Sequence, residues 1–401
     1  MIGAATAHAL AEAGACVAVL EAAGAGSATS AASFAVDVSR LKTPRSLFEL
    51  AVASTREHER LERTVGRDRW RHPAGTLECE ASEDGRRRIR ARVRRLREWG
   101  HPAEWLPADR ARALEPAIDL PVGDAEEVAF FSEGAWYDPP VLVRALFERA
   151  RSLGADMSWH DPAVAVDTAA GGVTGVRTAA GRRIRTRVVV DCAGPEAAHV
   201  AALAGVRLPL RRVPGLVVTT APARTGLRMI IAVAGLNLRP AADGRVVLHS
   251  WCADAELGPG PQWPERDELA ARLLARARRL VPALGDVEVG FARVGVRPVP
   301  PDGLPLVGFL PGVEGFYAVV SHSGVQLAPI LGRLAAAELT GTRQGVLEPF
   351  RPARSTTGHT APEALDESTR VMLSQMTATR TEESAGGSAP RPSGETSAAT
   401  P

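Results

Sequence analysis

Residues 1–21 read MIGAATAHALAEAGACVAVLE. Residues 4–13 are rich in alanine and predict a helix, which Gly14 ends as the first residue beyond it. Residues 16–20 form a continuous apolar run, typical of a buried strand in a parallel sheet, and Glu21 follows directly. A glycine, a small-residue helix and such a strand in this order predict a βαβ unit, so the fold class is α/β.

The same stretch also predicts a binding site. In a dinucleotide-binding βαβ unit, the third of three glycines lets the helix pack closely on a strand, and an acidic residue after the second strand binds ribose hydroxyls. Gly3 fits the third glycine and Glu21 fits the acidic residue. We therefore expect the first strand and the first two glycines of this motif to be missing before Met1. The alternative interpretation is an ordinary parallel βαβ packing unit.

A loop of small and hydroxyl-bearing residues, GAGSATSAAS, follows at residues 24–33. Small side chains let backbone N–H groups approach a pyrophosphate, and the hydroxyls can donate hydrogen bonds to it. The alternative is a flexible surface loop. Its position directly after Glu21 favours the phosphate-binding interpretation.

Three further segments have the pattern of strand ends and tight turns. Residues 188–194 run from an apolar strand into Ala193 and Gly194. Residues 295–298 read GVRP, and residues 302–308 read DGLPLVG, which ends at Gly308. Residues 319–329, VVSHSGVQLAP, predict a strand followed by a helix N-terminus, whose free N–H groups and positive dipole end suit electron-rich oxygens.

Together these segments resemble the D-amino-acid oxidase-like FAD-dependent oxidoreductases, a family that includes glycine oxidase, sarcosine oxidase and D-amino-acid dehydrogenase. The resemblance covers about residues 1–350 and includes GAWYDP at residues 134–139. It implies a Rossmann-like FAD-binding domain interleaved with an antiparallel-sheet α+β substrate domain. The implied FAD-binding domain takes residues 1–43, 134–205 and 296–350, and the substrate domain takes residues 44–133 and 206–295.

The resemblance also implies a set of cofactor-binding residues. Glu21 would hold the adenosine ribose, residues 29–33 would line the diphosphate and flavin, and residues 324–327 would cap the pyrimidine edge of the flavin. The backbone of Ala163 or Val164, with that of the 193–194 turn, would reach the adenine side. The full set is Gly3, Glu21, Thr29, Ser30, Ala31, Ala32, Ser33, Ala163, Val164, Ala193, Gly194, Gly308, Gly324, Val325, Gln326 and Leu327.

Two residues are the candidates for contact with a substrate. Arg297 matches the arginine that clamps the substrate carboxylate in amino-acid-oxidising relatives, and a guanidinium suits bidentate recognition of that planar anion. The alternative for Arg297 is a structural ion pair. His322 has two predicted roles, contact with substrate or flavin and a purely structural role. Gly295 stands where some relatives attach their flavin to a cysteine, so we expect noncovalent FAD.

Composition excludes several other classes. Lys42 is the only lysine, so a Schiff-base or P-loop lysine has no candidate in a suitable motif. The four cysteines form no CxxC pair and lie at no metal-ligand spacing, so we expect no metal site and a reducing, cytoplasmic compartment. The net charge is +2 and no apolar run reaches membrane-spanning length, so we expect neither a nucleic-acid partner nor a membrane span.

Two segments are judged by composition alone. The arginines of the predicted helix at residues 83–99 are expected to form a solvated face opposite one apolar stripe, with nucleic-acid binding as the alternative. Residues 351–401 contain few bulky apolar side chains and are predicted to be a disordered tail.

The expected reaction is oxidation of a small amine by hydride transfer to flavin, followed by hydrolysis of the imine. The substrate would be a D-amino acid, a glycine-like amino acid or an N-methyl amino acid, and oxygen or another acceptor would reoxidise the flavin. One alternative is an inactive, truncated family member that does not retain FAD. A nicotinamide-only dehydrogenase is disfavoured because it gives no role to Arg297 or to residues 321–329.

Overall fold

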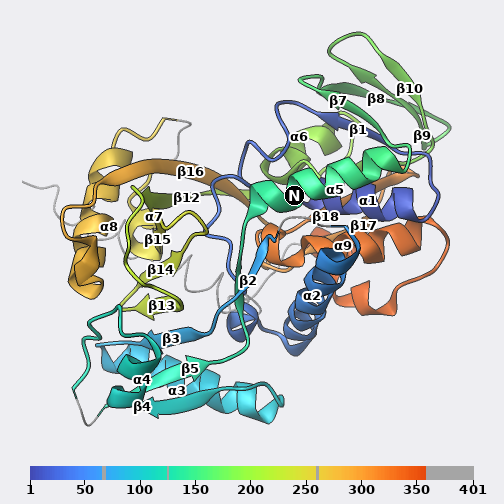
Figure 1. Cartoon of the computed structure of the whole chain (residues 1–401). Coiled ribbons are helices and arrows are strands. Elements are labelled where there is room, and N and C mark those ends of the chain that lie inside the picture. The colour runs from blue at the N-terminus through green and yellow to red at the C-terminus, as the bar shows by residue number, and fades with distance from the viewer. Residues whose placement is uncertain (66–68, 124–125, 259–261, 358–401) are drawn as a thin grey trace, which may run out of the picture.

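The computed structural model describes residues 1–65, 69–123, 126–258 and 262–357. The chain forms two lobes that lie side by side (Figure 1). The first lobe contains the N-terminus and helices α1, α5 and α9, and the second contains an eight-stranded sheet. Among the described residues, no helix combines the length and the apolar character needed to cross a membrane.

The first lobe is built from segments at both ends and in the middle of the chain. Its elements are α1 (Ile2–Glu12), β1 (Ala18–Glu21), α2 (Arg45–Thr64), β2 (Arg71–Pro73), β6 (Ala135–Tyr137), α5 (Pro139–Ser152), β7 (Asp156–Trp159), β8 (Ala163–Ala169), β9 (Gly172–Thr178), β10 (Arg183–Arg185), β11 (Val189–Asp191), α6 (Ala197–Ala202), β17 (Leu306–Phe309), β18 (Phe316–Val320) and α9 (Gly324–Leu339).

The second lobe takes the two intervening stretches. Its elements are β3 (Thr76–Cys79), α3 (Glu83–Glu98), β4 (Glu104–Pro107), α4 (Ala108–Leu114), β5 (Glu127–Phe131), β12 (Arg211–Thr220), β13 (Ile230–Val233), β14 (Leu236–Pro240), β15 (Val246–Ser250), α7 (Trp251–Ala255), α8 (Arg266–Leu280) and β16 (Val289–Val299). Short 3-10 helices lie in the connections: η1 (Ser39–Leu41), η2 (Gly194–Glu196), η3 (Pro282–Leu284), η4 (Gly345–Phe350) and η5 (Pro352–Thr357).

Two strand pairs of the first lobe are parallel, as the apolar runs predict, and its other pairs are antiparallel. β1 pairs in parallel with β7, with Glu21 opposite Trp159, and β11 pairs in parallel with β18, with Asp191 opposite Ala318. The α/β fold class is therefore confirmed. Parallel pairing brings the carboxyl ends of the paired strands to the same edge, which is where ligands bind in open α/β sheets.

Small residues let the helices of the first lobe approach closely. The alanines of α1, such as Ala4 and Ala5, are buried against α9. A Cβ added to Gly332 of α9 would lie 2.6 Å from the backbone carbonyl carbon of Ala5, so larger side chains would force the two helices apart. The predicted helix at residues 4–13 is confirmed, and it begins two residues earlier than predicted.

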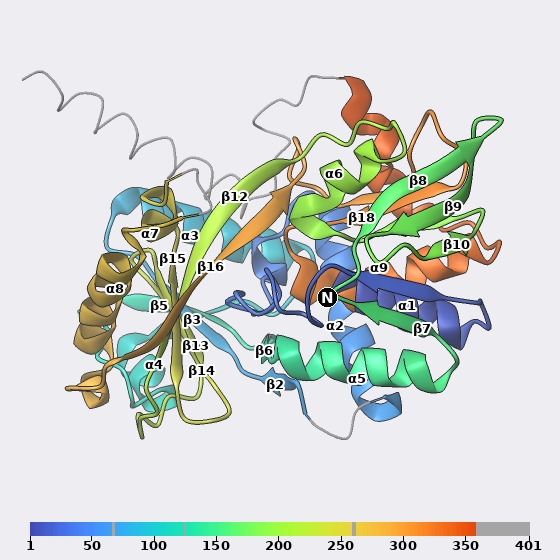
Figure 2. The ribbon, with the colours of Figure 1, turned by 90° about the horizontal axis from the view of Figure 1, so that it is seen from above.

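The sheet of the second lobe has the order β16-β12-β15-β14-β13-β3-β5-β4. The pairing of β3 with β13 is parallel and joins two stretches of sequence far apart in the chain, while the other neighbours are antiparallel. Seen from above, β12 and β16 run as a long pair from the sheet toward the first lobe (Figure 2).

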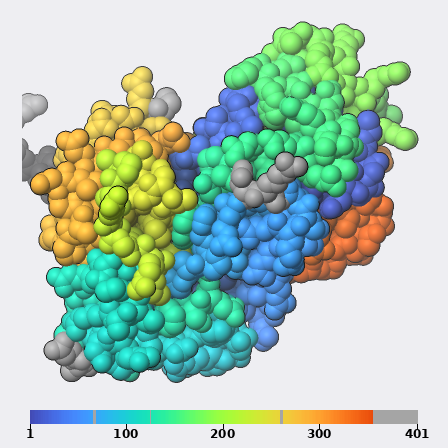
Figure 3. All heavy atoms as spheres, viewed as in Figure 1, coloured from blue at the N-terminus to red at the C-terminus, as the bar shows by residue number. Residues whose placement is uncertain are grey.

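The two faces of this sheet differ because side chains alternate along each strand. Leu216, Val218, Leu238 and Leu248 point to one face, where they pack against the leucines of α8. The opposite face carries polar and charged side chains and lies toward the first lobe, since it contacts the loop that follows β1. In the space-filling view, atoms of the first part of the chain, coloured dark blue, lie at the boundary between the lobes (Figure 3).

Helix α2 packs into the first lobe, although the predicted domain boundary at residue 43 assigns it to the substrate domain. Its buried Leu47, Leu50 and Ala51 belong to the same apolar core as α1 and α9. The hydroxyl of Ser54 also donates a 2.6 Å hydrogen bond to the carbonyl of Gln326 in α9. The amphipathic stripe of α2 is typical of a helix but carries no information about which core the helix joins.

The arginines of α3 are only partly the solvated face that composition predicts. Arg86 and Arg90 are exposed and pair with Glu83 in the first turn. Arg92 is instead 5% exposed and forms an ion pair with Glu78 of β3. The correction follows from packing, because α3 lies directly against β3 and turns one of its arginines toward a buried carboxylate.

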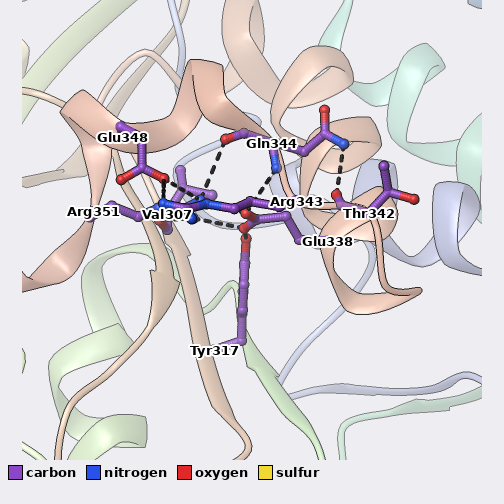
Figure 4. A network of polar contacts seen from close by, with 8 residues as sticks. All are labelled: Val307, Tyr317, Glu338, Thr342, Arg343, Gln344, Glu348 and Arg351. Carbon is purple, nitrogen blue, oxygen red and sulfur yellow. Dashed lines mark hydrogen bonds and ion pairs between the residues drawn. The ribbon is translucent and has the colours of Figure 1, made fainter.

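The chain stays structured beyond residue 350, so the predicted start of the tail is too early. Arg351 donates a 2.7 Å hydrogen bond to Glu338 at the end of α9, and Glu338 also accepts one of 2.7 Å from the Tyr317 hydroxyl (Figure 4). Arg354 pairs with Asp302 at 2.6 Å. The rest of the predicted tail, residues 358–401, lies outside the described residues.

Candidate functional site

Two helices begin with open N-termini next to each other. Neither α1 nor α9 has a side-chain cap, and neither has an acidic residue in its first turn. An added Cβ on Gly324 of α9 would lie 3.6 Å from the Ile2 side chain of α1, so the two helix starts adjoin. Unpaired N–H groups and the positive ends of two helix dipoles therefore converge, an arrangement suited to anions and electron-rich oxygens.

Gly3 lies where the close-packing glycine of a dinucleotide-binding unit is expected. A Cβ on Gly3 would approach the Cβ of Cys192, just beyond β11, to 3.3 Å. That distance is tighter than ordinary van der Waals contact, so a side chain here would push α1 away from the strand end. The structure thus shows that Gly3 packs closely against the chain after β11, and its role as the third glycine of a cofactor-binding motif stays a prediction.

The predicted adenosine-side residues lie near the ends of the parallel strands. Glu21 is the last residue of β1, and its carboxylate accepts a 2.9 Å hydrogen bond from the N–H of Ala23. Ala163 and Val164 open β8, and Val164 is 49% exposed. The carbonyl of Glu21 accepts from the N–H of Asp161, two residues before β8, so these segments adjoin.

A buried carboxyl group lies at the end of β11, just before a tight turn. Ala193 and Gly194 follow Asp191, and Gly194 adopts a φ of 61°. The N–H of Ala193 donates to Asp191 Oδ1 at 3.0 Å, while Oδ2 has no hydrogen-bond partner among the described residues. Burial raises the pKa of Asp191 to about 7, so its charge is poorly stabilised where it lies.

The small-residue loop at residues 24–33 lies against β16 of the second lobe. The Thr29 hydroxyl donates a 2.8 Å hydrogen bond to the carbonyl of Val296. A Cβ on Gly295 would lie 2.8 Å from the carbonyl oxygen of Ala32, so glycine is required there. The loop therefore contacts the second lobe at Thr29 and Ala32, and its role in binding phosphate stays a prediction.

The first turn of α9 is fixed by a buried polar network. The Gln326 amide donates to Asp37 Oδ1 at 2.7 Å and to Ser39 Oγ at 2.8 Å. Thr55 of α2 donates to the other oxygen of Asp37 at 2.5 Å. Since the side chain of Gln326 is engaged in this way, and those of Val325 and Leu327 are buried in the core, residues 324–327 offer a cofactor their backbone.

Several residues in this network were missed by sequence reasoning. His58 of α2 stacks on Tyr137 with ring centroids 4.2 Å apart, and its Nε2 lies 3.2 Å from the carbonyl of Gln326. Burial lowers the pKa of His58 to about 4, so it is neutral at pH 7. Lys42 is fully buried and donates to Ser323 Oγ at 2.7 Å. No local sequence pattern marks these contacts, and those with Gln326 and Ser323 join residues more than 250 positions apart.

Arg297 lies in an ion pair on the polar face of the sheet. Its Nη2 donates to Asp254 Oδ2 at 2.7 Å, and the His249 Nε2 lies 3.0 Å from the same oxygen. Asp254 is fully buried, and its Oδ1 accepts from the N–H of Leu216 at 2.7 Å. Burial alone would raise the pKa of Asp254, but Arg297 and His249 together hold this pKa below its usual range.

Arg297 thus has the structural ion pair that was one of its two predicted roles, and its contact with a substrate stays a prediction.

His322 is half-buried in the turn between β18 and α9. Gly308 lies on β17, where an added Cβ would come to 3.0 Å from Pro352, so its packing partner is the chain after η4. Neither placement tests a role in binding.

A second arginine of the same sheet face lines a cavity between the lobes. Arg239 is 5% exposed, and its guanidinium lies over the rings of Trp136 and Phe34, 5.0 and 5.8 Å from their centroids. The cavity has a volume of about 260 Å³ and is also lined by Ser33 and Phe291. No sequence signal pointed to Arg239.

These features fit an FAD molecule. The two open helix N-termini, the close-packed Gly3 and the small-residue loop suit phosphates and a flavin edge, and Glu21 lies at the strand end that a ribose would reach. The sequence pattern of the family described as FAD dependent oxidoreductase (DAO) matches residues 1–338. The chain therefore belongs to this family of FAD-dependent oxidoreductases.

Similar proteins include oxidases of small amino acids. A glycine oxidase of Bacillus licheniformis is 27% identical over 373 residues, which cover 90% of this chain and 96% of that protein. Subunit HcnC of the hydrogen cyanide synthase of Pseudomonas aeruginosa is 26% identical over 298 residues, or 73% of this chain and 70% of that protein.

The fold is similar to solved structures of the family. The crystal structure of L-proline dehydrogenase from P. horikoshii matches with a TM-score of 0.80 and 18% identity, covering 90% of this chain and 96% of that one. The glycine oxidase from Geobacillus kaustophilus matches with a TM-score of 0.77 and 24% identity, at the same coverage. These likenesses confirm the fold.

Proposed function

We propose that this protein oxidises a small amino acid, either a D-amino acid, glycine or an N-methyl amino acid, at the boundary between its two lobes. Two observations support the proposal. The family is that of FAD-dependent amino-acid oxidases, and the sheet face turned toward the cofactor-binding segments carries arginines suited to a carboxylate. The second of these observations carries the choice of an amino acid over a simple amine.

The residues of this chain would supply binding and orientation. Residues 29–33, Gly3 and Glu21 would hold the cofactor without a covalent bond, and the backbone at residues 324–327 would meet its pyrimidine edge. The chemistry that FAD supplies when bound is acceptance of a hydride from the carbon next to the substrate nitrogen. The product imine then hydrolyses in water, and oxygen or another acceptor takes up the electrons.

Arg297 and His322 are the proposed substrate-facing residues. Arg297 would meet the carboxylate as one member of a pair with Asp254, and the ion pair would fix the direction of its guanidinium. His322, next to the start of α9, would lie at the substrate or flavin side of the turn. No general base is needed if the amine binds in its neutral form.

The experiment is an anaerobic screen for flavin reduction. The FAD-loaded full chain is mixed with glycine, sarcosine and D-alanine, and with glycinamide as a matched compound that lacks the carboxylate. We expect at least one of the acids to bleach the visible flavin absorption and glycinamide to be much slower. Bleaching by none of the amino acids, or equal bleaching by glycinamide, would contradict the proposal.

A further inference from the structure

The polar face of the eight-stranded sheet carries four arginines that line or adjoin the space between the lobes. Strand alternation places Arg293 and Arg297 of β16 on this face. Arg239 of β14 lies opposite Val247 of β15, and Val247 in turn lies opposite Thr219 of β12. Val247, Thr219 and Arg239 line the same 260 Å³ cavity, together with Arg245 and Arg293. The face is therefore positively charged where it meets the loop after β1.

Most of these arginines already have compensation. Arg297 pairs with the fully buried Asp254, and Arg245 pairs with Asp243 at 2.8 Å. Arg293 is exposed, so water screens its charge. The cation that differs from the others is Arg239.

Arg239 is buried without an anionic partner among the described residues. Its Nε donates to the carbonyl of Phe34 at 2.6 Å and its Nη1 to the carbonyl of Pro240 at 2.9 Å, and these are neutral acceptors. Burial lowers the pKa of Arg239 to about 10. The negative charge of Asp138 acts to raise this pKa but offsets only part of the effect of burial. Buried charges are ordinarily paired, so a guanidinium in this position indicates a binding partner from outside the chain.

The surroundings of Arg239 fit a small planar anion. The guanidinium lies over the rings of Trp136 and Phe34, its Nε and Nη1 are engaged by two carbonyl groups, and Nη2 has no hydrogen-bond partner among the described residues. Arg239 lines the cavity together with Ser33. A fixed guanidinium edge facing a cavity favours a carboxylate, which it can bind through parallel hydrogen bonds.

We propose that Arg239 is a carboxylate-binding residue of this protein, and that it supplies the net positive charge for the carboxylate of the amino-acid substrate. The inference rests on the proposed function for the identity of that substrate. Arg297 contributes within a pair of zero net charge, whereas the charge of Arg239 has no ion-pair partner among the described residues and is only partly offset by Asp138. Arg239 is thus a specificity-determining residue for acids over neutral amines.

The test measures carboxylate binding separately from catalysis. Acetate and its neutral analogue acetamide are titrated into the FAD-loaded full chain by isothermal titration calorimetry at low salt, for the wild type and for Arg239→Met, Arg239→Lys and Arg245→Met. Arg239→Met keeps the length of the side chain and removes its charge. Arg245→Met is the matched control, because Arg245 lines the same cavity and is already paired.

We expect the wild type to bind acetate and not acetamide. Arg239→Met should weaken acetate binding about 10- to 100-fold, the loss expected for a charged hydrogen bond. Arg239→Lys should keep part of the affinity, and Arg245→Met should stay within about twofold of the wild type. Circular dichroism of each variant checks its fold, and Arg239→Lys keeps the test decisive if Arg239→Met does not fold.

Unchanged acetate binding in both Arg239 variants, or an equal loss in Arg245→Met, would overturn the proposal. The flavin-reduction screen is a separate readout. Acetate binding that depends on Arg239, without flavin reduction by any amino acid, would refute the proposed function and leave the carboxylate site standing. Flavin reduction with an unchanged KM in Arg239→Lys and Arg239→Met would refute the site and leave the function standing.

Discussion

The ion pair between Asp254 and Arg297 is a buried contact of the second lobe whose removal has a large predicted effect. Asp254→Asn keeps the size of the side chain and an oxygen for the N–H of Leu216, so the change removes mainly the charge. Breaking a buried pair from one side costs about 3–5 kcal/mol. Because Arg297 keeps 16% side-chain exposure, we expect a loss near the lower limit, about 3 kcal/mol in the free energy of unfolding.

The assay is equilibrium unfolding in urea, followed by circular dichroism, for Asp254→Asn, Arg297→Met and the double variant. The double variant should lose less stability than the two single losses added together, because it leaves no unpaired charge. Asp167→Asn is the control, since Asp167 and Arg177 form an exposed pair and its loss should cost about 1 kcal/mol or less.

The effect should also depend on pH in a defined direction. The pKa of Asp254 is lowered in the folded protein, so the pair stabilises the fold above the ordinary carboxyl pKa of about 3.9 and loses this contribution as the pH falls through the lowered value. The difference between wild type and Asp254→Asn should therefore be full at pH 7 and shrink in acid. Equal stability of the two proteins at pH 7, or strictly additive losses in the cycle, would refute the reasoning.

Three further predictions concern single positions. Burial raises the pKa of Asp191 from 3.8 to about 7, so ionising this carboxyl group at pH 8 lowers the free energy of unfolding by about 4 kcal/mol. Asp191→Asn should therefore raise the thermal midpoint at pH 8 and have little effect near pH 4. A Cβ on Gly215 would overlap the guanidinium of Arg297, so Gly215→Ala should displace that side chain and destabilise the protein about as much as Arg297→Met, measured by urea unfolding. Glu338→Gln should cost about 1–2 kcal/mol by weakening the contact with Arg351, and thermal unfolding would show it as a lower midpoint.

The parts of the fold that the sequence predicts are those with a local pattern. The helix and strand before Glu21 follow from residue spacing. Gly3 was recognised because a close-packing glycine has a fixed place relative to helix and strand. These features need no knowledge of the rest of the chain.

The contacts that sequence reasoning missed depend on residues brought together by the fold. Gln326 was predicted as a cofactor contact from its place at a helix start, but the partners of its side chain, Asp37 and Ser39, lie almost 290 residues earlier. The partner of Arg297, Asp254, lies on another element, and the unpaired state of Arg239 appears only when every neighbour is known. Charge compensation is a property of the packed lobes, so no local pattern encodes it.

Binding of FAD by the purified full chain tests the central claim most directly. The protein is incubated with FAD, freed of unbound cofactor by gel filtration, and its visible absorption spectrum is recorded against a heat-denatured control. We predict that the folded protein carries flavin absorption at about one FAD per chain, as the open helix N-termini, Gly3 and Glu21 require. A folded protein that elutes without flavin absorption after this treatment would contradict the account.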